Sequence, residues 1–163
     1  MKKNEARLRS VYENQTLAEG LSVFSVFASL MFVYAFGYIM AMSFAESLEY
    51  AARILLIAAL PFLLVSLARA LIRAPRPYEV YTFYEKKPHR AVGKSFPSWH
   101  AFSAFAIAAL MLFFNVTFAF LLSLLAIVLC VCRYLLGIHF PRDLIAGALI
   151  GICTSLLGLW ILL

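Results

Sequence analysis

Three short clusters of polar residues could carry chemistry in this sequence. They occupy residues 69–77, 95–100 and 132–143, and each stands at the edge of a long apolar run. Ionisable side chains beside or inside membrane segments are costly to keep there, so they point first to a functional site. Arginine, serine, histidine and aspartate recur in these clusters, and that combination suits the handling of a phosphate group.

The first cluster offers two guanidinium groups. Arg69 and Arg76 are seven residues apart, close to two helical turns, so a continuing helix would face both toward one point. The planar fork of a guanidinium matches phosphate oxygens. Alternatively, both side chains extend to the membrane surface and only anchor a helix.

The second cluster begins a helix. Ser98 fits an N-cap, and a helix N-terminus presents N–H groups and a positive dipole to an anion. His100 would then stand in the first turn, beside that anion. The alternative is a capped helix with an interfacial Trp99 and a structural histidine.

The third cluster pairs a histidine with a carboxylate. His139 and Asp143 are four residues apart, so the carboxylate can orient one ring nitrogen and leave the other as nucleophile or base. Arg133 adds a third guanidinium. Asp143 could instead only complement the dipole of a helix first turn.

Taken together, the clusters favour phosphoryl transfer through a phosphohistidine, with arginines instead of a metal stabilising the charge. No cofactor is expected. A lipid-phosphate binding or transport subunit without catalysis remains an alternative, although binding alone needs no oriented nucleophile. A metal site built from His100, His139 and Asp143 is disfavoured, since the surrounding arginines would repel a cation.

The clusters resemble the motifs of the type 2 phosphatidic-acid phosphatase superfamily, which includes vanadium haloperoxidases. Its first motif is a basic residue, six others and Arg-Pro, as at residues 69–77, with Arg69 for the usual lysine. Its second, Pro-Ser-Gly-His, matches residues 97–100 with Trp99 for glycine. Its third, Ser-Arg, five others, His, three others and Asp, matches residues 132–143 with Cys132 for serine.

The resemblance implies a role for each matched residue. His139 would attack phosphorus while Asp143 holds its ring, and His100 would protonate the leaving oxygen. The phosphate oxygens would be bound by Arg69, Arg76, Arg133, Ser98 and the backbone at Trp99. The family is metal-independent, and its lipid substrates include polyprenyl (undecaprenyl-type) diphosphate, phosphatidylglycerophosphate and phosphatidic acid.

The elements that position these residues are membrane helices. The hydrophobic fraction is 64% and the charged fraction 13%, against about 45–50% and about 25% in soluble proteins. We expect an all-α integral membrane bundle of about five transmembrane helices. The expected segments are a polar N-terminal segment over 1–19, either an interfacial helix or a frayed tail, a membrane phosphatase domain over 20–163, spans over about 21–42, 50–72, 98–114, 116–136 and 143–163, and an active-site loop over 73–97.

Local signals mark some of the boundaries. Ser43 and Glu46 form a capping-box pattern that predicts the start of the second span. Gly137 is expected to end the fourth span, and Pro141 suits the first turn of the fifth.

The distribution of basic residues predicts the orientation. With five spans, every lysine and arginine except Arg53 lies on the face that carries the three clusters. The positive-inside rule then places the site on the cytoplasmic face, and we expect a bacterial inner membrane. Membrane members of the family usually have six spans and an extracytoplasmic site. The net charge of +6 points to lipid headgroups rather than nucleic acid; the loop cations that could attract a headgroup, or only reflect the orientation, are Lys86, Lys87, Arg90 and Lys94.

Overall fold

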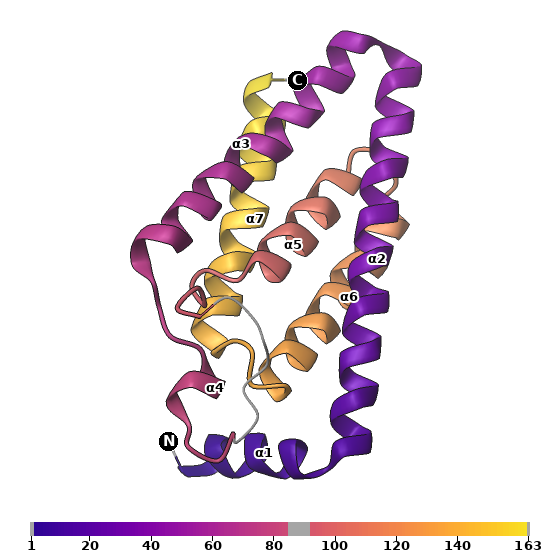
Figure 1. Cartoon of the computed structure of the whole chain (residues 1–163). Coiled ribbons are helices and arrows are strands. Elements are labelled where there is room, and N and C mark those ends of the chain that lie inside the picture. The colour runs from indigo at the N-terminus through magenta and orange to yellow at the C-terminus, as the bar shows by residue number, and fades with distance from the viewer. Residues whose placement is uncertain (1, 85–91, 163) are drawn as a thin grey trace.

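The computed structural model describes residues 2–84 and 92–162, so Lys86, Lys87 and Arg90 lie outside the described residues. Within these ranges the chain is helical and contains no strand. The helices are α1 (Lys2–Glu13), α2 (Gln15–Glu46), α3 (Leu48–Ile72), α4 (Pro77–Val80), α5 (Trp99–Met111), α6 (Val116–Leu135) and α7 (Pro141–Leu162) (Figure 1). The expected all-α membrane fold is confirmed.

Four helical segments are long and apolar enough to cross a bilayer, and they contain α2, α3, α6 and α7. The expected span over 98–114 is shorter than predicted. Helix α5 has 13 residues, or roughly 20 Å at 1.5 Å per residue, against a hydrocarbon core of about 30 Å. It is short because Ser98 caps its start and the chain leaves the helix before Asn115, which caps α6 by accepting from the Phe118 N–H.

The predicted capping box at Ser43 is wrong. Ser43 is buried inside α2, and its hydroxyl donates to the Ile39 carbonyl at 2.7 Å. Ser47 caps α3 instead, accepting from the Tyr50 N–H at 3.0 Å. A serine within a helix can bond back to the carbonyl four residues earlier, which satisfies its hydroxyl in apolar surroundings.

Helices α5 and α7 pack backbone to backbone. A Cβ added at Gly147 would lie 2.5 Å from the Ser98 carbonyl oxygen, and one at Gly151 would lie 2.4 Å from that of Phe102. Small residues at helix interfaces allow this close approach in membrane proteins. The contact also joins two of the sequence clusters, since the Ser98 N–H donates to the Asp143 carbonyl at 2.9 Å.

Helix α1 lies across one end of the bundle, beside α4 (Figure 1). Its apolar residues Leu8 and Val11 are buried, whereas Arg7 and Arg9 are exposed. This division of faces is typical of an interfacial helix. We call this end of the bundle the α1 end, and the opposite end, where α2 turns into α3, the far end.

Candidate active site

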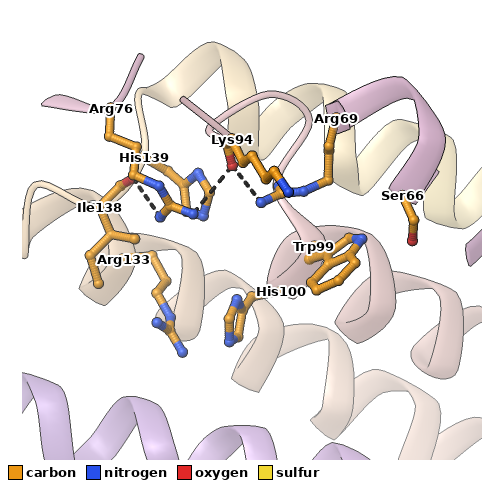
Figure 2. Close-up of a pocket in the computed structure, with 9 residues that line it drawn as sticks. All are labelled: Ser66, Arg69, Arg76, Lys94, Trp99, His100, Arg133, Ile138 and His139. Atoms are coloured by element: carbon orange, nitrogen blue, oxygen red, sulfur yellow. Dashed lines mark hydrogen bonds between the residues drawn. The ribbon is translucent and has the colours of Figure 1, made fainter. Parts of the chain in front are cut away.

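A cavity of about 470 Å³ lies where α3 and α6 end and α5 begins. Figure 1 shows these helix ends on the side of the bundle toward the α1 end. It collects side chains from α3, α5, α6, the segment between α3 and α4, and the two loops that precede α5 and α7. The structure thus brings together residues from all three sequence clusters. Its lining comprises Ser66, Arg69, Arg76, Lys94, Trp99, His100, Arg133, Ile138 and His139 (Figure 2).

Backbone carbonyls hold the first two arginines. Arg69 donates to the carbonyls of Pro97 and Lys94. Arg76 donates to the carbonyls of Lys94 at 3.2 Å and Ile138 at 3.3 Å. The Lys94 carbonyl therefore joins the two guanidinium groups, as Figure 2 shows. A guanidinium has five N–H donors in a fixed fork, so it can bond a carbonyl and an anion at once.

The two arginines do not share a helix. Helix α3 ends at Ile72, and Arg73 adopts a left-handed conformation with φ 49°. Arg76 follows in extended backbone as the residue before α4. Both are nevertheless buried, with 6% of Arg69 and 7% of Arg76 exposed. The turn after α3, rather than helical periodicity, thus brings the two guanidinium groups together.

His139 and Asp143 lie close together but not in direct hydrogen-bond contact. His139 Nδ1 is 3.9 Å from Asp143 Oδ2. Ser95 stands between them: its hydroxyl donates to Asp143 Oδ2 at 2.5 Å and lies 3.4 Å from His139 Nδ1. The Phe140 N–H also donates to Asp143 Oδ2, at 3.0 Å. All three side chains are buried, so water does not compete for these contacts.

The surroundings of His139 favour its neutral form. Burial lowers the pKa of His139 below its usual value, and the nearby positive charge of Arg76 acts in the same direction. Asp143 partly opposes this shift, without reversing it. A neutral imidazole keeps a lone pair on one nitrogen, which nucleophilic attack requires.

Arg133 and His100 complete the polar lining. Arg133 lies in the last turn of α6 and is buried, and His100 lies in the first turn of α5 and is half-buried. Both side chains line the cavity and are drawn in Figure 2. Two predicted residues do not line it: Asp143 sits behind His139, and the Ser98 hydroxyl caps α5 by accepting from the Ala101 N–H at 3.4 Å.

Trp99 lines the cavity and contacts α3 at its edge. Its ring stacks on Phe62 with a centroid distance of 5.2 Å and an interplanar angle of 19°. The Arg69 guanidinium carbon lies 5.0 Å from its ring centroid. Aromatic rings attract cations over their faces. Trp99 therefore contributes a large side chain to a position where the family motif has none.

Ser95 and the Lys94 carbonyl were missed by the sequence reasoning. Ser95 stands three residues before Ser98 and opens the second cluster, so a hydroxyl at the edge of a polar cluster was the available signal. The carbonyl carried no signal at all, since every residue has one.

The alternative of a metal site can be compared with the arrangement of possible ligands. Among residues 2–84 and 92–162, no three side chains of His, Cys, Asp or Glu lie together as metal ligands would. The disfavoured alternative set of His100, His139 and Asp143 is thus not grouped as ligands of one ion.

Comparisons with known proteins place the chain in a family. A family model described as the PAP2 superfamily matches residues 50–163. Over 85 residues the chain is 31% identical to the bacitracin transport permease protein BcrC of Bacillus licheniformis, covering 52% of this chain and 42% of that protein. The aligned stretch thus spans less than half the length of that relative.

The fold also matches a solved structure. The crystal structure of a transmembrane PAP2-type phosphatidylglycerolphosphate phosphatase from Bacillus subtilis superposes with a TM-score of 0.71 and 20% identity, covering 98% of this chain and 84% of that one. At that identity, the match establishes the fold alone. The family model covers well over half of the chain and confirms the resemblance found in the motifs, and the chain therefore belongs to the PAP2 superfamily.

Proposed function

We propose that this protein is a membrane-embedded lipid phosphatase that removes the terminal phosphate of a lipid mono- or diphosphate through a phosphohistidine. One observation carries the proposal: His139 is buried against Ser95 and Asp143, yet lines a cavity that three arginines also line. A binding site alone would need the arginines but not a neutral, oriented imidazole.

In the first step His139 attacks phosphorus. Its Nδ1 faces Ser95, so Nε2 is the attacking nitrogen, and an N–P bond forms while the bond from phosphorus to the lipid oxygen breaks. His100 donates a proton to the departing oxygen. Arg69, Arg76 and Arg133 stabilise the charge that spreads over the phosphoryl oxygens.

In the second step water cleaves the N–P bond. His100, now neutral, accepts a proton from the water as its oxygen bonds to phosphorus. Inorganic phosphate leaves, and His139 recovers its lone pair. His100 thus makes both proton transfers in this two-step reaction.

Ser95 links Asp143 to His139 in this scheme. A hydroxyl has one proton to donate, and at 2.5 Å that proton goes to Asp143 Oδ2. The lone pairs of Ser95 can then accept the Nδ1–H of His139. Asp143 therefore fixes the tautomer of His139 through a hydroxyl, rather than directly.

The substrate reaches the site within the bilayer. The cavity lies between helices whose outer faces are apolar and exposed, among them Leu63, Leu67 and Leu71 of α3. Candidate lipids are a polyprenyl (undecaprenyl-type) diphosphate, phosphatidylglycerophosphate and phosphatidic acid. One solved structure that shares this fold is of a phosphatidylglycerolphosphate phosphatase, which supports a phosphorylated lipid as substrate.

We further propose that the site faces the cytoplasm of a bacterial cell. Arg69 and Arg133 lie in the last turns of α3 and α6, and Arg76 directly precedes α4. In Figure 1 these segments lie on the side of the bundle toward α1, which carries the exposed Arg7 and Arg9. Arg53, the exception to this distribution, pairs with Glu49 at the far end. Positive charge gathers on the cytoplasmic side of membrane proteins.

The test is phosphate release from a panel of these lipids in detergent micelles, with a chelator present. Wild type should release phosphate, and His139→Ala should lose more than about 1,000-fold in kcat/KM because its nucleophile is gone. His89→Ala is the matched control, since His89 lies outside the described residues and the proposal gives it no role. It should retain activity.

A second measurement identifies the intermediate. A substrate with labelled phosphate should leave acid-labile label on wild type and none on His139→Ala. Activity in His139→Ala would overturn the phosphohistidine. Lipid-phosphate binding without turnover by wild type would instead favour the alternative of a binding or transport subunit.

A further inference from the structure

Trp99 stands where the polar cavity meets an apolar groove. The groove has a volume of about 240 Å³ and lies between α3 and α5. Its lining includes Phe36, Leu55, Phe62, Phe102, Ile107 and Leu110. Phe62 lines the groove and stacks on Trp99, which lines the cavity with the arginines. The two spaces therefore adjoin at this aromatic pair.

The same two helices border both spaces. On α3, Phe62, Ser66 and Arg69 follow one another at helical spacing and share a face. Phe62 belongs to the groove, and the other two belong to the cavity. On α5, Trp99 and His100 line the cavity, and Phe102 lines the groove. A molecule with a charged head and a hydrocarbon tail fits along this path.

The Trp99 side chain is fixed at the junction. It contacts Phe62 through its ring face and Arg69 through a cation–π contact, and 39% of its surface is exposed. Turning the ring away would break both contacts. Trp99 thus narrows the path from the arginines to the groove, where glycine would leave it wide.

We propose that Trp99 determines specificity, admitting lipids whose phosphate is carried by a single hydrocarbon chain over those with a two-chain glycerol backbone. The inference rests on the proposed function and adds the substrate class. A single chain leaves the phosphate without branching and can pass the indole. A diacylglycerol branches a few bonds from phosphorus. The indole centroid lies only 5.0 Å from the Arg69 guanidinium carbon, so the ring competes with this branch for space.

Trp99 also positions Arg69, so its removal should slow the reaction with every substrate. Specificity must therefore be judged from the ratio of kcat/KM for two lipids, in which a general loss cancels. Farnesyl phosphate represents the single-chain class, and dioleoyl phosphatidic acid the two-chain class.

The experiment compares both lipids in wild type, Trp99→Phe and Trp99→Gly. Wild type should prefer the single chain, and Trp99→Gly should shift the ratio toward the two-chain lipid by about tenfold or more, the size expected when a pocket changes shape. Trp99→Phe should shift it less and keeps an aromatic ring against Phe62. Trp160→Gly is the matched control, because Trp160 is 84% exposed near the end of α7.

The outcomes separate the two proposals. A ratio that stays within about twofold of wild type in Trp99→Gly, or a wild-type preference for the two-chain lipid, overturns the role of Trp99. If Trp99→Gly fails to fold, the role of Trp99 is judged from two other results. These are the preference of wild type and the shift of the ratio in Trp99→Phe. A wild type that releases phosphate from neither of these lipids, nor from any lipid of the panel that tests the proposed function, overturns the proposed function itself, and with it this inference.

Discussion

Cavities of nearly equal size occur toward the two ends of this bundle, and of these two only the one toward the α1 end is lined by several arginines. The cavity toward the α1 end has about 470 Å³. The far-end cavity has about 430 Å³ and is lined by Met42, Glu46, Ser47, Tyr50, Phe113 and Phe114. Volume therefore says little about function. The two ends differ in how deeply their arginine side chains are buried.

At the far end the arginine side chain is exposed to a large extent. Arg53 pairs with Glu49 at 2.5 Å, with 45% of the arginine side chain and 75% of the glutamate side chain exposed. Exposed ion pairs of this kind contribute little to the stability of the fold. At the α1 end, Arg69, Arg76 and Arg133 are buried at 6–7% exposure. Burying several cations together is costly, and the cost is justified where an anion binds among them.

The sharpest test of this contrast exchanges arginines for alanine at each end. Arg76→Ala should lower kcat/KM by about 100- to 1,000-fold, the effect of removing one group that stabilises a developing oxyanion. Arg53→Ala should change it less than about twofold, as expected for an exposed pair. The measurement is phosphate release in micelles. Equal losses of kcat/KM in the two variants would contradict the distinction between a functional α1 end and a structural far end.

The Ser95 bridge gives a smaller effect. Ser95→Ala should lower kcat by about 10- to 100-fold, because the buried Asp143 carboxylate loses one of its two donors and the Nδ1–H of His139 loses its acceptor. Ser95→Thr keeps the hydroxyl and should recover most of that loss. Ser123→Ala is the control, since the Ser123 hydroxyl only bonds back to Ala119 within α6. A threonine variant as slow as the alanine variant would mean that packing, not the hydroxyl, matters.

Helix packing separates the two ends further. Gly147→Ala meets the Ser98 carbonyl, a backbone atom, whereas Gly158→Ala nearer the far end meets only side-chain atoms of Ile57. Both should destabilise the fold, by about 1–3 kcal/mol for the first and less for the second. Thermal unfolding in detergent measures this cost. Only Gly147→Ala should also slow phosphate release, since Ser98 leads into the helix that carries His100.

The pH profile offers the mildest test. Because burial lowers the pKa of His139, its neutral form persists below the ordinary imidazole value of about 6.5. The acidic limb of kcat/KM should therefore fall below pH 6.5, where an exposed histidine would already be half protonated. An acidic limb at or above 6.5 would show that His139 is not held neutral, or is not the nucleophile.

The sequence predicted the class of fold and most of the candidate site. Apolar length and composition identified the membrane helices, and spacing identified the residues that now line the cavity from three clusters. Gly137 takes a left-handed conformation with φ 65° after α6, as expected of a residue that ends a helix. These features depend on local pattern, which a sequence displays directly.

What the sequence could not predict depends on distant partners. Ser43 and Ser47 both fit a cap by type, and only the path of the backbone decided between them. The stack of Trp99 on Phe62 joins residues from separate helices. Ser95 gained its neighbours from a loop more than 40 positions away.

The Lys94 carbonyl has a consequence for how this protein tolerates mutation. Arg69 and Arg76 both depend on an oxygen that every amino acid carries, proline included. Position 94 can therefore change its side chain over generations without loosening either arginine. A comparison of sequences would then find position 94 variable and suggest that it is dispensable, although its carbonyl accepts hydrogen bonds from both arginines. Only a shift in the course of the main chain would reveal its importance.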